Sequence, residues 1–154
     1  MYRQPQWTSK YLMGAFCYIW AADGSATMDT SGSARGRYKI EFHQSNHDLL
    51  VVFKDRLAER GHNFGIYPKK VVATDFDRTR EAYRLTFLGD RAAHVKLARD
   101  MLTVLTPSCS PATCWDKVKR LQIMVEYAQD IEGGAVAYKK LRGNKDDSVL
   151  PGLN

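Results

Sequence analysis

The sequence is poor in the features that mark secreted and membrane proteins. Its three cysteines, Cys17, Cys109 and Cys114, are an odd number with no disulfide pattern. The Cys109-x4-Cys114 spacing also lacks the second ligand pair of a zinc site. The apolar, uncharged run at residues 11–22 has twelve residues, whereas a membrane-spanning helix needs about 20. Residues 1–10 show no signal-peptide pattern. We therefore expect an intracellular protein in a reducing setting, with no membrane partner.

Acidic residues are also scarce. The chain has 17 Asp and Glu against 23 Lys and Arg, which gives a net charge of +6 and a pI of about 9.3. Such an excess favours a polyanionic partner, and nucleic acid is the default candidate. The length of 154 residues, the 44% hydrophobic content and the absence of repeats predict one domain over residues 1–154 with a single core.

The uncharged run ends at Asp23 and Gly24. A helix that is apolar on all sides is expected to be buried on all sides, and glycine typically follows a helix end. A carboxylate at that end lies among carbonyls that carry partial negative charge, so a divalent cation would remove the conflict. The alternative is a plain Asp-Gly turn into a strand. The small residues on one face, which would let a second helix approach closely, are Gly14, Cys17 and Ala21.

The rest of the chain alternates between period-two and helical patterns. Strands are expected over 25–30, 37–44 and 64–73, and over a segment with Tyr83, Leu85 and Phe87 that follows a turn at 74–79. Helices are expected over 47–60, 91–103 and 112–131, the last of them ending at Gly133-Gly134, with a short helical piece at 135–142. The order predicts an α+β fold, αββαββα, in which helices cover one face of a four-stranded antiparallel sheet and additional C-terminal helices follow.

The other face of this sheet is predicted to be basic. Cations hold phosphates, and varied polar groups read base edges in the major groove, so such a face suits DNA. The alternative is a solvated sheet face. The predicted base readers are Arg37, Lys39, Glu41, His43 and Arg84. Phosphate contacts are predicted at Lys69, Lys70 and Lys139 or Lys140, and the turns add Arg35, Arg78 and Arg80 as DNA-binding residues.

The segment Phe16-Cys17-Tyr18-Ile19-Trp20-Ala21-Ala22-Asp23-Gly24, followed by Ser25, resembles the motif of the LAGLIDADG homing endonucleases. In that family the helix ends in an acid and a glycine and leads into a strand, within a domain of order αββαββα and a saddle-like sheet. The resemblance covers roughly residues 10–105, and helices over about 106–143 would form a C-terminal extension. Tyr18 and Ala21 depart from the family, which usually has a small residue and often an acid there. The chain carries one such motif and so resembles the homodimeric branch of the family.

The resemblance implies a site-specific, metal-dependent homing endonuclease, encoded in an intron, that cuts double-stranded DNA. Two copies of the first helix would pack across a two-fold axis through Gly14, Cys17, Tyr18 and Ala21. Each copy would bring Asp23 to a scissile phosphate, where Asp23 and Ala22 would hold Mg²⁺, with two or three ions per dimer active site. Two-fold symmetry demands a long, pseudo-palindromic DNA site.

The resemblance also implies supporting catalytic residues. Asn46 aligns with a polar residue that orients water near the metal, with Gln44 close behind; the alternative for Asn46 is a helix cap. The active-site lysine is assigned to Lys117, with Lys119 as a second candidate, and the alternative is a solvated helix face.

Two other functions stay open. The same scaffold could be a non-catalytic splicing factor that binds its own intron RNA, or the chain could be an unrelated basic α+β protein. His43 and His47 are interpreted as DNA-facing or surface residues, and Asp75-Phe76-Asp77 as a polar turn.

Overall fold

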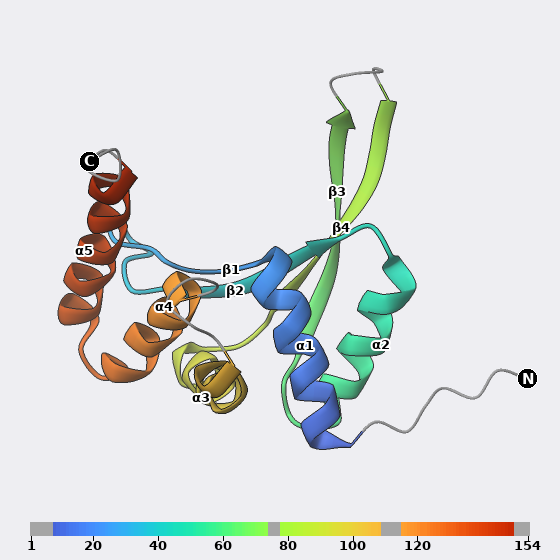
Figure 1. The fold of residues 1–154 in the computed structure, drawn as a ribbon, viewed down its shortest axis with the longest axis horizontal. Helices are drawn as coiled ribbons and strands as arrows, with labels where there is room; N and C mark the ends of the chain where they lie inside the picture. The colour runs from blue at the N-terminus through green and yellow to red at the C-terminus, as the bar shows by residue number, and fades with distance from the viewer. Residues whose placement is uncertain (1–7, 74–77, 109–114, 150–154) are drawn as a thin grey trace, which may run out of the picture.

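The computed structural model describes residues 8–73, 78–108 and 115–149. The elements are α1 (Ser9–Asp23), β1 (Gly24–Met28), β2 (Tyr38–Gln44), α2 (His47–Ala58), β3 (Phe64–Ala73), β4 (Arg78–Phe87), α3 (Arg91–Ser108), α4 (Trp115–Glu126) and α5 (Ile131–Val149) (Figure 1). The predicted α+β class and the order of the first seven elements are confirmed.

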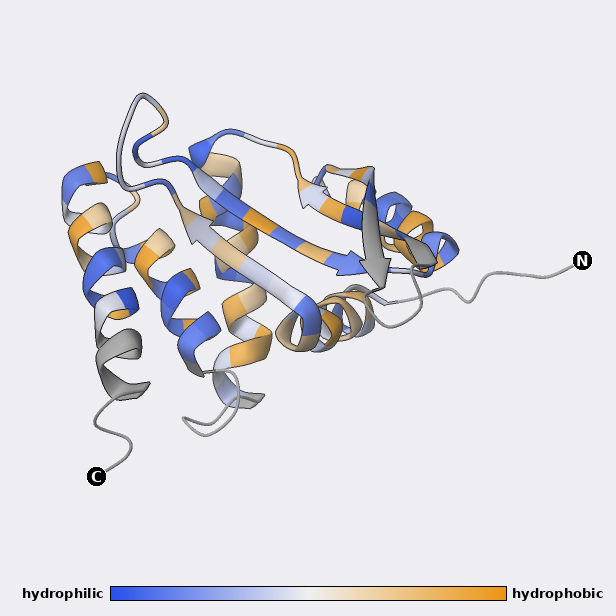
Figure 2. Ribbon diagram, turned by 90° about the horizontal axis from the view of Figure 1, so that it is seen from above, coloured by the Kyte–Doolittle hydropathy of each residue, from blue (hydrophilic) through white to orange (hydrophobic). Residues whose placement is uncertain are grey.

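The four strands form one antiparallel sheet in the order β1-β2-β4-β3. Helices α1 to α4 lie on one side of it, and α5 flanks the end near the β1–β2 loop (Figure 1). Figure 2 looks onto the open face, where hydrophilic and hydrophobic residues alternate along β2. This alternation places Tyr38, Ile40 and Phe42 in the core, while Lys39 and His43 lie on the other face.

Helix α1 is the centre of the core. Thr8 caps it by accepting a hydrogen bond from the Tyr11 N–H at 3.1 Å. The buried ring of Phe16 makes edge-to-face contacts with Phe42 of β2, Phe53 of α2 and Phe64 of β3, at 5.5–6.0 Å between centroids. One side chain of α1 therefore joins three other elements, and aromatic pairs in this geometry add to the burial energy.

Arg91, at the start of α3, joins two connecting segments to that helix. Its guanidinium donates to the carbonyls of Gly36, Tyr127 and Ala128 at 2.6, 2.8 and 2.9 Å. It also lies 4.2 Å from the ring centroid of Tyr38. The β1–β2 loop and the α4–α5 turn are thereby fixed to α3.

The structure corrects the expectation that α1 is buried on every side. Tyr11 and Tyr18 on one face are 59% and 81% exposed, and Ala22 and Asp23 are exposed as well. The core covers only the opposite face of α1, which carries Phe16 and Trp20.

The predicted helix over 112–131 corresponds to α4, which ends earlier, at Glu126, and the predicted short piece at 135–142 lies within the longer α5. Asp130 begins α5 by accepting a hydrogen bond from the Gly133 N–H at 2.9 Å, an N-terminal cap. The glycine pair that seemed to end a helix therefore lies in the first turn of the next one. Two further boundaries differ: β4 begins at Arg78, inside the predicted turn, and α3 continues to Ser108.

Within the described ranges, no helix has the length and apolar character needed to cross a bilayer.

Candidate functional site

The junction between α1 and β1 is built around Trp20 and Gly24. Gly24 is extended, with φ −97° and ψ 173°, and its N–H donates to the Trp20 carbonyl. A Cβ atom at Gly24 would lie 2.2 Å from Cδ1 of the Trp20 ring. The indole is fully buried and its Nε1 donates to the Ser25 carbonyl at 3.3 Å. Close packing, and not a left-handed backbone, therefore requires the glycine, and it holds Asp23 exposed at the helix end.

Lys117 of α4 reaches the same helix end. Its Nζ donates to the Ala21 carbonyl at 2.8 Å and lies 3.5 Å from the Trp20 carbonyl. It is also 5.8 Å from the centroid of the Trp20 ring. A cation is favourable at a helix C-terminus, where the carbonyls carry partial negative charge. The structure thus brings Lys117 within one helical turn of Asp23, whereas Lys119 is exposed elsewhere on α4.

The end of β2 lies at this edge of the sheet. Gly24 pairs with Phe42, so Gln44 continues past the start of β1 on the side where α1 ends. Asn46 accepts a hydrogen bond from the Leu49 N–H at 3.1 Å and caps α2, the alternative foreseen for it. The Gln44 Oε1 accepts from the Ser45 N–H at 3.0 Å.

One face of α1 is open along its length. Tyr18 projects from its middle, and a Cβ added at Gly14 would meet nothing within 4 Å. Ala21 is half-buried. Cys17 does not belong to this face: it is buried, its Sγ donates to the Met101 carbonyl at 3.8 Å, and burial raises its pKa to about 12. The prediction of Cys17 as an interface residue is wrong, because its stripe packs on α3.

The open sheet face carries a buried carboxylate among cations. Glu41 is only 8% exposed. Its Oε1 lies 3.6 Å from Lys39 Nζ and 3.8 Å from His43 Nε2, and its Oε2 lies 3.5 Å from Arg84 Nε. Thr86 donates its hydroxyl to Oε2 at 3.0 Å. The prediction of Glu41 as a base reader is corrected, because the carboxylate is occupied by its neighbours.

The surroundings of His43 lower its pKa and favour the neutral imidazole. Burial lowers its pKa first, and the cations Lys69, Arg84 and Lys39 lower it further, while Glu41 opposes them. A neutral imidazole can both donate and accept a hydrogen bond. His43 therefore suits recognition of a polar group better than neutralisation of a phosphate.

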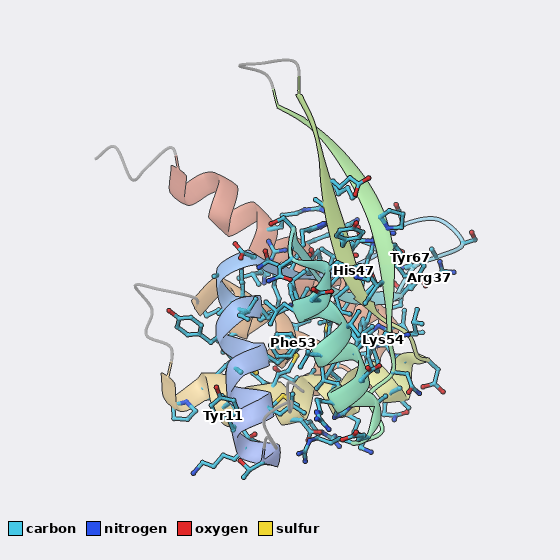
Figure 3. The ribbon with its side chains drawn as sticks, turned by 90° about the vertical axis from the view of Figure 1, so that its right-hand side faces the viewer. Tyr11, Arg37, His47, Phe53, Lys54 and Tyr67 are labelled. Carbon is cyan, nitrogen blue, oxygen red and sulfur yellow. The ribbon has the colours of Figure 1, made fainter. Side chains whose placement is uncertain are left out.

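Tyr67 is a residue of this face that the sequence reasoning missed. It is 39% exposed and lies on β3 two residues before Lys69, in register with Arg84 (Figure 3). Its ring centroid is 5.5 Å from the Arg84 guanidinium carbon. The alternation of residues along 64–73 already places Tyr67 and Lys69 on one face, so that pattern could have identified it.

The other predicted contacts divide into three groups. Arg37, just before β2, and Lys69, on β3, are exposed, and so are Lys139 and Lys140 on α5. Arg35 is instead engaged in the loop, where it donates to the Thr30 carbonyl at 2.8 Å and to Glu132 at 2.6 Å. The side chains of Lys70, Arg78 and Arg80, and all of residues 74–77, lie outside the described residues.

In the described part of the chain, no three His, Cys, Asp or Glu side chains gather closely enough to hold a metal ion.

No known protein-family model matches the sequence, and a comparison with curated proteins finds no match. The resemblance to the LAGLIDADG family remains a prediction.

Proposed function

We propose that the chain is a homodimeric, magnesium-dependent endonuclease that cuts both strands of DNA at a long, pseudo-palindromic site, as the LAGLIDADG resemblance implies. One observation carries the proposal. The exposed carboxylate of Asp23 ends a helix whose last turn is bound by Lys117, at the edge of a sheet with a cationic open face. An acid and a cation therefore lie together where α1 meets a sheet whose open face carries Lys39 and Arg84.

The open face of α1 supports the homodimer. Tyr18 is the most exposed large apolar side chain among the described residues, and Gly14, Ala21 and Ala22 leave room for a second backbone. Helices pack closely where small residues meet. Because a two-fold interface uses the same patch twice, it would bring two Asp23 residues to the centre of the dimer.

The donor set fits a magnesium ion. Mg²⁺ is usually held by one or two carboxylates together with waters and substrate phosphates. Asp23, the Ala22 carbonyl and the second copy's carboxylate would meet that need, with two or three ions per dimer. When bound, the ions would activate water and stabilise charge on the phosphate. Two unscreened carboxylates at such close range would otherwise repel each other strongly.

The chain's own residues then have distinct roles. Asp23 holds its oxygens toward the phosphate because Trp20 fixes the helix end. Lys117 neutralises the α1 carbonyls and provides positive charge where negative charge develops. Gln44, where β2 ends, would orient a water molecule, with Asn46 beside it. Lys39, Lys69 and Arg37 would position the duplex, and His43 and Arg84 would face the base edges.

A cleavage assay tests the proposal. A library of long, palindrome-like duplexes is incubated with the full chain in Mg²⁺ or in Ca²⁺. We expect Asp23→Asn to lower the cleavage rate by at least about 100-fold while duplex binding persists. Asp55→Asn, at an exposed acid on α2, changes the net charge equally and should cleave like the wild type. The proposal is wrong if Asp23→Asn still cleaves at the wild-type rate, or if the wild type cuts no duplex.

A second candidate is a non-catalytic factor that binds its own intron RNA. The exposed ring of Tyr67 on the cationic face favours it, because aromatic side chains stack on unpaired RNA bases. Tight binding of a structured intron RNA by a wild type that cuts no DNA would support this function.

A further inference from the structure

We infer that Arg84 is a preorganised guanine-reading residue, held in position by the Glu41 carboxylate and the ring of Tyr67. The inference rests on the proposed DNA-binding function and names a base that the sheet would select. Glu41 and Tyr67 are then positioning residues, and Arg84 makes the base contact.

Arg84 lies in the middle of one row across the sheet. It pairs with His43 of β2 on one side and Tyr67 of β3 on the other. The Tyr67 ring approaches its guanidinium carbon at 5.5 Å, a cation–π distance, and Glu41 Oε2 approaches its Nε at 3.5 Å. Two neighbours on different strands therefore restrain the inner part of the side chain.

The outer end of Arg84 remains available. Its side chain is 37% exposed, and among the described residues no hydrogen bond joins its two terminal nitrogens. Two parallel N–H groups on one arginine match the O6 and N7 acceptors of guanine in the major groove. Restraint of the side chain before binding lowers the entropy that the contact would otherwise cost.

Glu41 is suited to hold a cation and not to read a base. It is nearly buried, and Thr86, its partner in the neighbouring row, fixes Oε2 by a 3.0 Å hydrogen bond. The other carboxylate oxygen faces Lys39 and His43. A fixed anion at this depth orients the cations above it, and it disfavours phosphate at the same point.

Gly65 allows the ring of Tyr67 to take this position. It pairs with Thr86 in the same neighbouring row. A Cβ atom at Gly65 would lie 2.8 Å from Tyr67 Oη and 2.9–3.0 Å from two ring carbons. The ring thus lies back over the glycine, and Gly65→Ala would displace it without changing any charge.

The first test needs no DNA. In ¹⁵N-labelled full-length protein, the Nε–Hε signal of Arg84 is assigned by its loss in Arg84→Lys. We expect a resolved, slowly exchanging signal in the wild type and in Asp55→Asn, and a shifted, faster-exchanging signal in Glu41→Gln and Gly65→Ala. An Arg84 signal that is unchanged in both variants would overturn the positioning role.

The second test measures base preference. Duplexes are selected from a randomised pool in Ca²⁺, and the bound sequences are compared. The wild type and Asp55→Asn should select a G·C pair at one symmetric pair of positions. Arg84→Lys should reduce that preference about tenfold, since a bidentate pair discriminates by roughly that factor or more. Glu41→Gln and Gly65→Ala should relax preference at the same position, the former with equal or tighter total binding.

The outcomes separate the two proposals. If Arg84→Lys weakens binding to all sequences equally, the residue contacts phosphate and guanine reading is overturned. If the wild type binds no duplex, both guanine reading and the proposed function fail. A held Arg84 with no base preference overturns guanine reading and leaves cleavage to be decided by its own assay.

Discussion

The ring of Trp20 fills the space that a side chain at Gly24 would occupy, and only 2.2 Å separates Trp20 Cδ1 from the position of a Gly24 Cβ atom. The Asp23–Gly24 pair is therefore set by packing beneath it. A turn alone would accept several residues after the acid, whereas a fully buried indole against the backbone accepts none larger than glycine.

Gly24→Ala should destabilise the fold. The added methyl group collides with a ring that is buried and cannot withdraw, and overpacking of this kind costs about 1–3 kcal/mol. Urea unfolding followed by tryptophan fluorescence measures the loss. Gly143→Ala is the matched control, because a Cβ there meets nothing within 4 Å on α5 and alanine favours a helix. Equal stability of Gly24→Ala and the wild type would contradict this account of the junction.

Tyr18→Glu should weaken self-association without unfolding the protomer. The side chain points away from the core, so its charge costs nothing in the monomer but would be buried between two α1 helices. Sedimentation velocity at micromolar concentration should show a dimer for the wild type and at least a tenfold weaker dimer for the variant. Val136→Glu, at an exposed apolar residue of α5, should remain dimeric. A wild type that is monomeric, or equal effects of both variants, would refute the α1 interface.

His94 should make the fold less stable in mild acid. Burial lowers its pKa below 6.5, although hydrogen bonding to the Asp90 carbonyl, the Asp90 charge and the Gly89 carbonyl partly oppose this. The unfolded chain therefore binds a proton near pH 6.5 while the native state does not. The stability that His94 contributes is present above pH 6.5 and is lost as pH falls toward the lower native pKa.

His94→Phe tests this by removing the titration while keeping a ring against Phe87. The free energy of unfolding should fall less between pH 7 and pH 5 in the variant than in the wild type. His43, whose pKa is also lowered, adds its own pH dependence of stability over the same pH range. It is present in both proteins, so the difference between their profiles reports His94. Parallel pH profiles would count against a neutral native His94.

Lys39→Ala should reduce the salt dependence of DNA binding. Each phosphate that a lysine neutralises releases counterions, so losing one contact should reduce the slope of log K against log salt by about one. Lys54→Ala is the control, since Lys54 is exposed on α2 (Figure 3). Binding is measured by fluorescence anisotropy from 50 to 200 mM salt, a range over which counterion release is large. Identical slopes for both variants would mean that Lys39 meets no phosphate.

Periodicity was sufficient to predict the sheet, because a strand with one buried face repeats every two residues. Periodicity could not predict how deeply an individual side chain on either face is buried. Glu41 does lie on the face that the alternation indicates, yet its burial depends on Thr86 and Arg84, which come from a strand about 40 residues later. Side-chain contacts across strands have no local signature in the sequence.

For helix α1, the sequence pattern could not predict which face is buried. With apolar residues all round, nothing in residues 11–22 indicates which stripe the core covers, so Cys17 and Gly14 could not be separated. The position of Lys117 came from a family resemblance, and its contact with the Ala21 carbonyl spans 96 residues. The sequence could have predicted Asp130 as a helix N-cap, but the glycine pair that follows it suggested the end of a helix instead of the start of one.

Arg91 has a bearing on how far the chain could be shortened. The segment after α3 is an addition to the αββαββα unit. The Arg91 guanidinium nevertheless joins that unit to the α4–α5 turn, because two of its three carbonyl acceptors lie in the turn. Deleting α4 and α5 would leave the half-buried Arg91 guanidinium without two of its acceptors and would also remove Lys117. Energetically, the fold is complete only when its last two helices are in place.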